Sequence, residues 1–123
     1  MTIFPFLIYR YIFFAHSMDD YFTVYETEML KKLEEWYPRR DGYEIINPRD
    51  ILTGKGLSKE EIKKLSFWEI EHTYFFPEIL KCELVIVAKS WTNPAWRGKF
   101  TPGVLAEIRY AQDNEKKILE FCE

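Results

Sequence analysis

The fold is decided by the stretches Glu83-Leu-Val-Ile-Val-Ala-Lys89 and Thr101-Pro-Gly-Val-Leu-Ala-Glu107-Ile-Arg-Tyr-Ala111. The first stretch is a continuous apolar run, which is typical of a parallel strand buried on both faces. The second begins like a helix, with Thr101 as N-cap and Pro102 at the first position. Because open α/β sheets bind ligands beyond the carboxyl ends of their strands, this unit is expected to place Glu107 beside a pocket.

Outward from this unit, strands and helices alternate along the chain. Strands are predicted over residues 9–15, 43–48, 83–88 and 117–122, and helices over 21–37, 58–65, 67–80 and 101–114. Pro48 ends the second strand, and Pro77 either breaks or restarts the third helix. Ser58 and Glu61 form a capping-box pattern at the start of the second helix.

The first predicted helix is amphipathic and is closed by Pro38. Its apolar residues recur at intervals of three and four: Phe22, Tyr25, Met29, Leu33 and Trp36. Such spacing favours a helix with one face against the core.

Alternating strands and helices predict an α/β fold with a parallel sheet between two helical layers. We expect a single domain over residues 1–123, a small flavodoxin- or Rossmann-like three-layer fold with four strands in the order 2-1-3-4. In that order the loops after the first and third strands meet, which brings residues 16–20 close to residues 90–107.

Composition excludes several classes of function. A net charge of −3 and the lack of a basic stripe argue against nucleic-acid binding. Cys82 and Cys122 lack metal-ligand spacing and are expected to be reduced, buried thiols of a cytoplasmic protein. The apolar run from Ile3 to Ala15 is interrupted by Pro5 and Arg10, so it predicts a strand and neither an export signal nor a membrane span.

Common catalytic motifs are missing from the sequence. It contains no dinucleotide-binding or P-loop glycine pattern, no zinc-protease pattern, no cysteine pair and no nucleophilic-serine pattern. We therefore expect no cofactor and no metal, and a carboxylate mechanism is the best enzymatic option.

Glu107 is the candidate nucleophile. With Val104, Leu105, Ile108 and Ala111 as the buried stripe of the last helix, Glu107 is expected at its border and half buried. The helix dipole favours the anion there, which suits a nucleophile or an electrostatic stabiliser. The alternative is an ordinary glutamate that complements the dipole.

Two loops supply further candidates for substrate binding. The loop from Lys89 to Phe100 is long and carries Trp91 and Trp96, whose rings are suited to stacking on a nucleobase; alternatively they pack the loop or form a dimer contact. After the first strand, His16 is either a ligand of the substrate or a structural residue. Asp19 and Asp20 either begin the first helix with favourable negative charge, or one of them reaches a sugar hydroxyl or acts as a general acid.

The order of these elements resembles the nucleoside 2-deoxyribosyltransferase family, including its deoxynucleotide N-hydrolase relatives. In that family a D-x-V-V-A strand precedes a G-T-x-x-E-L-G-x-A helix, and here Gly103, Glu107 and Ala111 match the helix motif. Thr101 and the pair Ser90-Trp91 stand where the family has aspartates.

The resemblance implies cleavage of an N-glycosidic bond of a nucleoside or nucleotide, or transfer of its 2-deoxyribosyl group. Glu107 would be the nucleophile and would form a glycosyl intermediate. Substrate contacts are expected from the loop and helix-start positions His16, Ser17, Asp20, Ser90, Trp91, Trp96, Thr101 and Gly103. The resemblance also implies a homodimer or higher homo-oligomer.

Two other functions remain open from the sequence. The first is a catalytically silent nucleotide-binding or signalling module on the same fold. The second is a partner-binding protein, because 18% of the residues are aromatic and tyrosine and tryptophan are common interface anchors.

Overall fold

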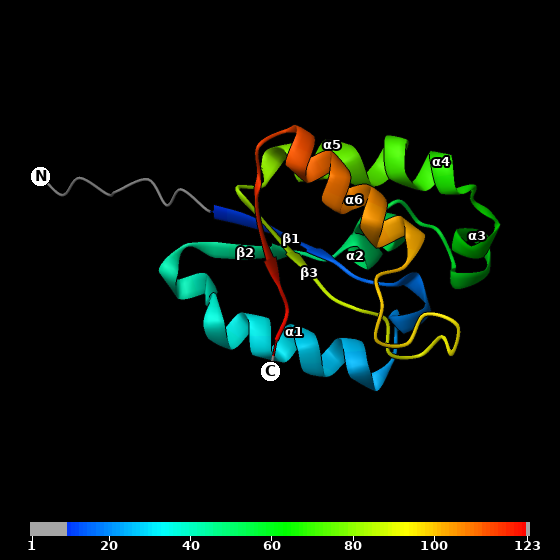
Figure 1. Cartoon of the computed structure of the whole chain (residues 1–123), viewed down its shortest axis with the longest axis horizontal. Helices are drawn as coiled ribbons and strands as arrows, with labels where there is room; N and C mark the ends of the chain where they lie inside the picture. The colour runs from blue at the N-terminus through cyan, green and yellow to red at the C-terminus, as the bar shows by residue number, and fades with distance from the viewer. Residues whose placement is uncertain (1–9, 123) are drawn as a thin grey trace, which may run out of the picture.

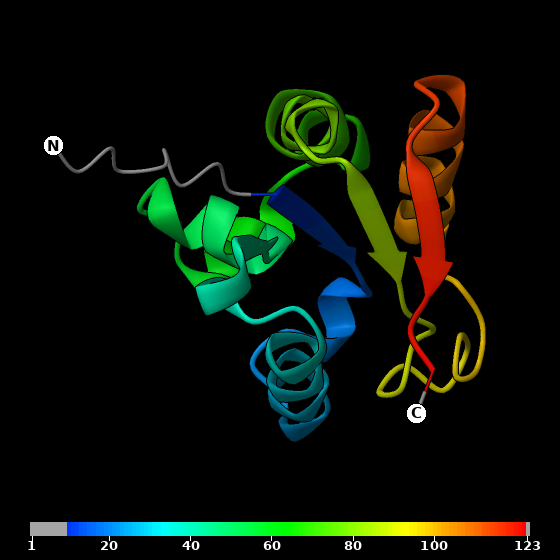
Figure 2. The same ribbon diagram turned by 90° about the vertical axis from the view of Figure 1, so that its left-hand side faces the viewer.

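Four parallel strands form the centre of the protein (Figures 1 and 2). In this computed structural model, which describes residues 10–122, the strands are β1 (Arg10–Ala15), β2 (Tyr43–Ile46), β3 (Leu84–Val87) and β4 (Lys117–Glu120). Their order is β2-β1-β3-β4, and all three pairings are parallel. The predicted fold class and strand order are therefore confirmed. Tyr9 and the apolar run before it lie outside the described residues.

Helices cover both faces of the sheet, as Figure 2 shows. On one face α1 (Val24–Trp36) packs on Ile12 and Phe14 of β1. On the other face the remaining helices enclose Phe13 and Ala15. Because successive side chains of a strand point to opposite faces, the buried apolar residues 12–15 of β1 and the wholly apolar β3 supply both halves of the core.

The first helix begins three residues later than predicted. A 3₁₀ turn, η1 (Met18–Asp20), precedes it, and Thr23 caps α1 with its side chain. Phe22, between the two, has a φ of 64°, which a helix interior does not allow. The predicted apolar stripe is also only partly right.

Met29 and Leu33 of that stripe are buried, but three of its members are at least 45% exposed: Phe22, Tyr25 and Trp36. Glu26 is buried in their place, with no exposed surface. Its partners, described below, explain why a carboxylate takes a core position.

After the 3₁₀ turn η2 (Arg39–Asp41) and β2, the chain forms α2 (Pro48–Gly54), which periodicity did not predict. The Asn47 side chain caps α2, and Pro48 occupies its first turn, where a missing N–H costs nothing. The next helix, α3 (Lys59–Lys64), has both hydrogen bonds of the predicted capping box between Ser58 and Glu61.

The aromatic stretch after α3 is one continuous helical run. It consists of α4 (Phe67–Glu69), the π-helix η3 (Ile70–Phe75) and α5 (Phe76–Lys81). Pro77 lies in the first turn of α5 and thus restarts the regular helix.

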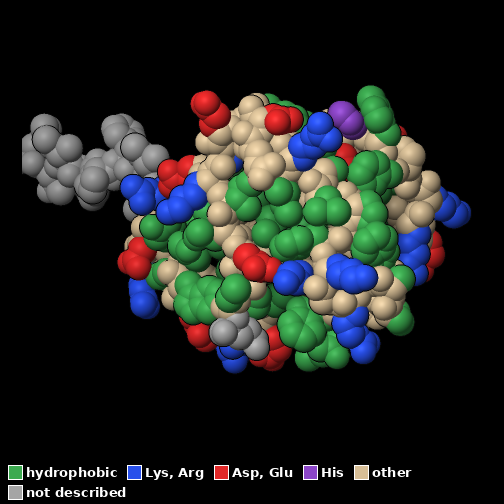
Figure 3. All heavy atoms as spheres, in the orientation of Figure 1, with side chains coloured by type: hydrophobic (Ala, Val, Ile, Leu, Met, Phe, Trp, Pro, Cys, Tyr) green, Lys and Arg blue, Asp and Glu red, His purple; other side chains and the backbone are tan. Residues whose placement is uncertain are grey.

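The last helix is α6 (Pro102–Asp113), and the Thr101 side chain caps it as predicted. Its buried residues are Val104, Glu107 and Ala111, whereas Leu105 is 49% exposed and does not belong to the buried stripe. Other exposed hydrophobic side chains are visible on the face of the molecule drawn in Figure 3.

Both cysteines of the chain are free. Cys82 is buried, and burial raises the pKa of its thiol to about 12. Cys122 is exposed, contrary to prediction, because β4 ends before it. Among residues 10–122, no helix has the length and apolar character needed to cross a bilayer.

Candidate active site

A cavity of about 350 Å³ opens at the carboxyl edge of the sheet, on the face covered by α6 and η3. Six of the nine predicted site residues line it: His16, Ser17, Trp96, Thr101, Gly103 and Glu107. They come from the loop after β1, the loop after β3 and the start of α6. The predicted meeting of these loops is thus confirmed.

Glu107 lies deeper than predicted. Only 3% of its surface is exposed, and its Oε1 has no hydrogen-bond partner. The half-buried position expected from the helix pattern was wrong because Leu105, and not Glu107, occupies the exposed border of α6. Burying a carboxylate without a cation partner is costly, so this environment favours the protonated form of Glu107.

A second carboxyl group, that of Glu71, lies against Glu107. Glu71 is 3% exposed, lines the same cavity and has an Oε2 without a partner. Its remaining interaction is a side-chain hydrogen bond with Glu107. Two carboxyl groups can hydrogen-bond only if one is protonated, so the pair holds at least one proton at neutral pH.

Burial and mutual repulsion shift the ionisation of this pair. Burial raises the pKa of Glu71 to about 7, an increase that the hydrogen bond from Glu107 reduces. Burial also raises the pKa of Glu107 well above its usual range, and the charge of Glu71 and their hydrogen bond raise it further. In the free protein the shared proton therefore resides mainly on Glu107. Burial outweighs the helix dipole, which was expected to favour the anionic form of Glu107.

Glu71 reaches the cavity from the π-helix η3. A π turn holds more residues per turn than an α-helix and occurs often at functional sites. Here it lets Glu71 face the cavity while Phe75, one turn on, stays 1% exposed in the core. Glu71 was not among the predicted site residues, because an α-helical period gives no reason to bring it beside α6.

Tyr21 adds a third ionisable group to this region. Its ring is 5% exposed, and its hydroxyl is buried with no hydrogen-bond partner. Burial raises the pKa of this phenol well above its usual range, and the carboxylates of Glu107, Glu71 and Glu26 raise it further. Tyr21 is therefore a neutral hydrogen-bond donor.

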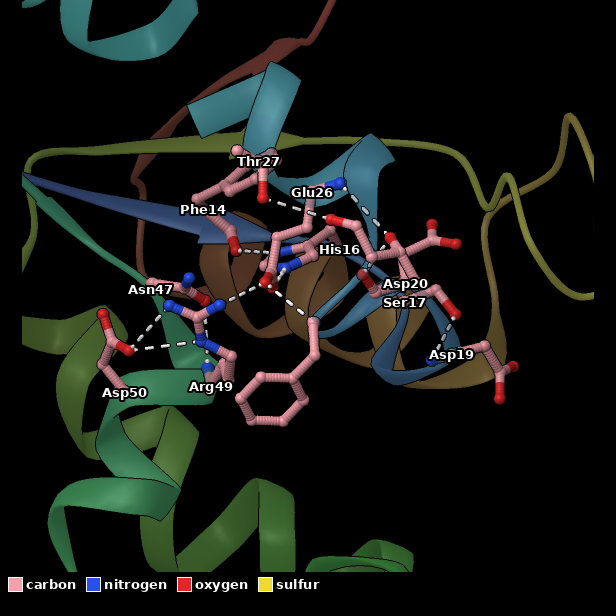
Figure 4. Close-up of polar contacts among 12 residues, drawn as sticks. Phe14, His16, Ser17, Asp19, Asp20, Glu26, Thr27, Asn47, Arg49 and Asp50 are labelled. Carbon is pink, nitrogen blue, oxygen red and sulfur yellow. Dashed lines mark hydrogen bonds and ion pairs between the residues drawn. The ribbon is translucent and has the colours of Figure 1, made fainter. Parts of the chain in front are cut away.

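His16 belongs to a buried polar network beneath the cavity (Figure 4). Its Nδ1 lies 2.9 Å from the carbonyl oxygen of Phe14, and its Nε2 lies 2.7 Å from Oε2 of Glu26. Arg49 of α2 binds the other oxygen of Glu26 at 2.5 Å, and the Phe22 N–H donates to the same oxygen at 3.0 Å.

This network explains why Glu26 is ionised in the core. Burial, the largest single effect, would raise the pKa of Glu26, but the hydrogen bonds and charges of His16, Phe22 and Arg49 together lower it. Both nitrogens of His16 face structural acceptors, so only the ring surface is presented to the cavity.

Asp20, Ser90 and Trp91 lie outside the cavity. The buried Asp20 carboxylate accepts the N–H groups of Trp91 at 3.1 Å and Thr92 at 2.8 Å, which ties the long loop to the loop after β1. Trp91 stacks on Tyr25 with ring centres 5.6 Å apart. Ser90 and Trp91 line a different cavity, near Cys122.

The lining of the first cavity has two halves with different chemistry. The carboxyl pair lies at one side, and apolar or aromatic side chains form the remainder: Ile62, Leu65, Phe67, Ile70, Phe75 and Trp96. Such a surface suits a planar, largely apolar group next to a reacting centre. Within residues 10–122, no three His, Cys, Asp or Glu side chains gather as a metal site would require.

Comparison with known proteins supports the architecture. No family model matches this chain, and no curated protein does. Among solved structures, the CMP N-glycosidase BcmB of Clostridium botulinum is similar, with a TM-score of 0.51 and 20% identity over 90% of this chain and 70% of that chain. At that level of identity the likeness shows a shared fold, and this protein is accordingly an α/β three-layer protein with a four-stranded parallel sheet.

Proposed function

We propose that this protein cleaves the N-glycosidic bond of a nucleoside or nucleotide, with Glu107 as nucleophile and Glu71 as acid and base. The observation that carries the proposal is the pair of buried, hydrogen-bonded carboxyl groups in a cavity with apolar walls. Retaining glycosidases use two carboxyl groups on opposite sides of the scissile bond, one as nucleophile and one as acid and base. The shared fold with a CMP N-glycosidase supports the choice of an N-glycosidic bond.

In the first step a carboxylate oxygen of Glu107 bonds to the anomeric carbon while the bond from that carbon to the base nitrogen breaks. The bonding electrons leave with the base, and the proton on Glu71 passes to it. The products of this step are the free base and a glycosyl ester on Glu107.

In the second step Glu71, now a carboxylate, removes a proton from a water molecule while the oxygen of that water attacks the anomeric carbon. The ester bond to Glu107 breaks, and the sugar is released. A second base in place of water would give glycosyl transfer by the same route.

The proton has to be on Glu71 when Glu107 attacks. In the free protein the proton lies mainly on Glu107, because the pKa of Glu107 is raised by the charge of Glu71. The two groups share a hydrogen bond, so the proton moves along one existing contact. A positively charged, oxocarbenium-like sugar beside Glu107 stabilises the required distribution.

The rest of the cavity fits the parts of such a substrate. Phe67, Phe75 and Trp96 provide aromatic surface for the base. Thr101 and Ser17 line the same cavity and offer hydroxyl groups to the sugar.

The test is chromatographic measurement of free base released from a panel of ribo- and deoxynucleosides and their 5′-monophosphates. We expect release by the wild-type protein, and loss of at least about a hundredfold in Glu107→Gln and in Glu71→Gln. Glu69→Gln is the matched control, because Glu69 belongs to the same helical run and is exposed.

A second readout separates the two roles. With a slow substrate, Glu71→Gln is expected to accumulate protein whose mass has increased by one glycosyl unit, and Glu107→Gln is not. Absence of base release from every substrate by folded wild-type protein would contradict the proposal and favour a nucleotide-binding module without catalysis.

A further inference from the structure

Tyr21 carries a buried polar group that the proposed reaction does not use. Its ring is 5% exposed, and its hydroxyl is shielded from solvent and has no hydrogen-bond partner among residues 10–122. A buried hydroxyl that makes no hydrogen bond lowers the stability of the folded protein. Phenylalanine has the same shape without this cost, so folding alone does not account for a tyrosine at this position.

Two acceptors without donors lie in the same buried region. Glu107 Oε1 and Glu71 Oε2 are shielded from solvent and have no partner among the described residues. The Tyr21 ring belongs to the core cluster that contains Val104, three residues before Glu107, and Ile70, next to Glu71. Burial raises the pKa of the Tyr21 phenol most, and among the nearby charges Glu107 has the largest effect and Glu71 the next. The hydroxyl is thus a donor near two acceptors that lack one.

The backbone around Tyr21 keeps its ring inside the protein. Phe22, the next residue, has a φ of 64°, a left-handed conformation that is strained for a large side chain. The Phe22 N–H donates to Glu26 Oε1 at 3.0 Å, which holds this conformation in place. As a result Phe22 is 50% exposed, whereas Tyr21 stays in the core. Strain of this kind persists only where surrounding contacts impose it, so the inward position of Tyr21 depends on the buried Glu26.

The network around Glu26 also contacts the Tyr21 ring directly. The His16 imidazole lies against that ring, with ring centres 5.0 Å apart. Figure 4 shows how His16 is held: its Nε2 lies 2.7 Å from Glu26, which Arg49 binds from α2. The network therefore orients Tyr21 from two sides, through the Phe22 backbone and through the His16 ring.

Ionisable groups face Tyr21 from every element packed around it. They are Glu107 of α6, Glu71 of η3, Glu26 of α1, Arg49 of α2, His16 of the loop after β1 and, across a second cavity that Tyr21 also lines, Asp19, Lys59 and Lys63. Besides burial, three carboxylates raise the pKa of the phenol, and Arg49 alone lowers it. Tyr21 therefore stays neutral, and able to donate, throughout the range in which Glu71 titrates.

Resting on the proposed function, we infer that Tyr21 is a positioning residue: its hydroxyl donates a hydrogen bond to Glu107 Oε1 when Glu107 is ionised, which leaves the shared proton on Glu71. In the free protein that proton resides mainly on Glu107, whereas attack requires a Glu107 carboxylate and a protonated Glu71. A hydrogen bond to the charged form of a carboxyl group stabilises that form. The hydroxyl has no acceptor in the resting state and gains one in the reactive state.

The first test compares wild type with Tyr21→Phe, which lacks only the hydroxyl. On the best substrate of the panel we expect kcat to fall at least about tenfold and KM to change less than about twofold, because the hydroxyl acts on Glu107 and not on the substrate. The acidic limb of the pH profile of kcat/KM should move to higher pH by roughly half a unit or more, because the carboxylate loses a donor. Urea unfolding at about pH 5 should show stability equal to or above that of wild type.

Tyr25→Phe is the matched control, because Tyr25 is 45% exposed and its stack on Trp91 needs only the ring. It should leave kcat, KM and the pH profile unchanged. A structural role for the Tyr21 hydroxyl predicts a different pattern in Tyr21→Phe: lower stability, loss of base release in proportion to loss of folded protein, and an unmoved pH profile. That pattern would overturn the inference.

A second test does not depend on catalysis. Urea unfolding of wild type, Tyr21→Phe, Glu107→Gln and the double variant is measured at about pH 5 and about pH 9. The stability that the hydroxyl contributes should increase between these values in wild type, as the carboxyl pair ionises, and should stay constant in the Glu107→Gln background. An increase that persists in the Glu107→Gln background would assign the hydroxyl to Glu71 and overturn the inference.

The outcomes separate this inference from the proposed function. Base release by Tyr21→Phe equal to that of wild type would overturn the inference and leave the glycosidase function standing. Absence of base release by folded wild-type protein would contradict the proposed function, and the unfolding measurements would then decide the contact between Tyr21 and Glu107. A hydroxyl contribution that does not increase with pH would overturn that contact.

Discussion

Gly103 lies directly against Glu71: a Cβ atom added to Gly103 would be 3.3 Å from Glu71 Oε1 and 3.9 Å from Glu107 Oε2. The first turn of α6 therefore approaches both carboxyl groups at a position without a side chain. A side chain there requires the Glu71 carboxyl group to shift by a few tenths of an ångström.

Gly103→Ala should consequently impair catalysis more than folding. Alanine raises helix propensity by up to about 1 kcal/mol, so the free energy of unfolding should change little or rise. Base release should fall by about tenfold or more, because small displacements of reacting groups are costly. Unfolding in urea and base release measure the two effects, and unchanged release would contradict the close approach.

Stability should depend on pH through Glu71. Burial raises the pKa of Glu71 from 4.5 to about 7, so its contribution is fully present below pH 4.5 and is lost as pH rises through about 7. The shift corresponds to roughly 3 kcal/mol. Glu71→Gln should therefore become more stable relative to wild type as pH is raised from 4.5 to about 8.

Urea unfolding of both proteins across this range measures the difference. Glu69→Gln serves as the control, because its exposed side chain should give a difference that does not vary with pH. A constant difference between Glu71→Gln and wild type would contradict the burial of an uncompensated carboxyl pair.

Removal of the Glu26 carboxylate should destabilise the protein strongly. Glu26→Ala leaves His16 and Arg49 without their shared acceptor and should lower the free energy of unfolding by roughly 3 kcal/mol. The pKa of Glu26 is lowered, so this contribution is present at neutral pH and is lost as pH falls below the unfolded pKa. Chemical denaturation at pH 7 measures it.

Glu28→Ala on the same helix is the matched control and should cost less than about 1 kcal/mol, because Glu28 is exposed. Equal effects of the two substitutions would show that the network around Glu26 contributes no stability.

The Asp20 carboxylate should hold the long loop in place. Asp20→Ala removes the acceptor of the Trp91 and Thr92 N–H groups, so trypsin should cleave after Arg97 or Lys99 several-fold faster. Asp19→Ala, which loses only the contact with the Asn93 side chain, should have a smaller effect. Equal cleavage rates in wild type and Asp20→Ala would indicate that the loop is held by other contacts.

The fold could be predicted where local signals agreed with one another. Four of the predicted features depend only on neighbouring residues, and each was confirmed: the strands β1 and β3, the capping box at Ser58 and the helix cap at Thr101. The α2 helix was missed because it is short and has little periodicity. The start of α1 was misplaced because Phe22 fits the helical spacing but adopts a left-handed conformation.

The candidate site could be predicted only in part. Parallel strands end at the same edge, and this rule brought His16, Trp96 and Glu107 into one cavity. The same rule does not show which side of a loop a residue faces. Trp91 was therefore also predicted to line the cavity, but it stacks on Tyr25 instead. Glu71 lies far from Glu107 in sequence and is brought to it by a π-helix that no local pattern signals.

The π-helix at Ile70–Phe75 also determines how the site responds to a change in chain length. A π turn takes up about one residue more than an α-helical turn, so deleting one residue within this segment would leave the flanking residues of the run on nearly the same faces. The helices α4 and α5 would keep their places, and the change would fall on the segment that carries Glu71. A single codon here therefore alters the carboxyl site on an otherwise unchanged scaffold.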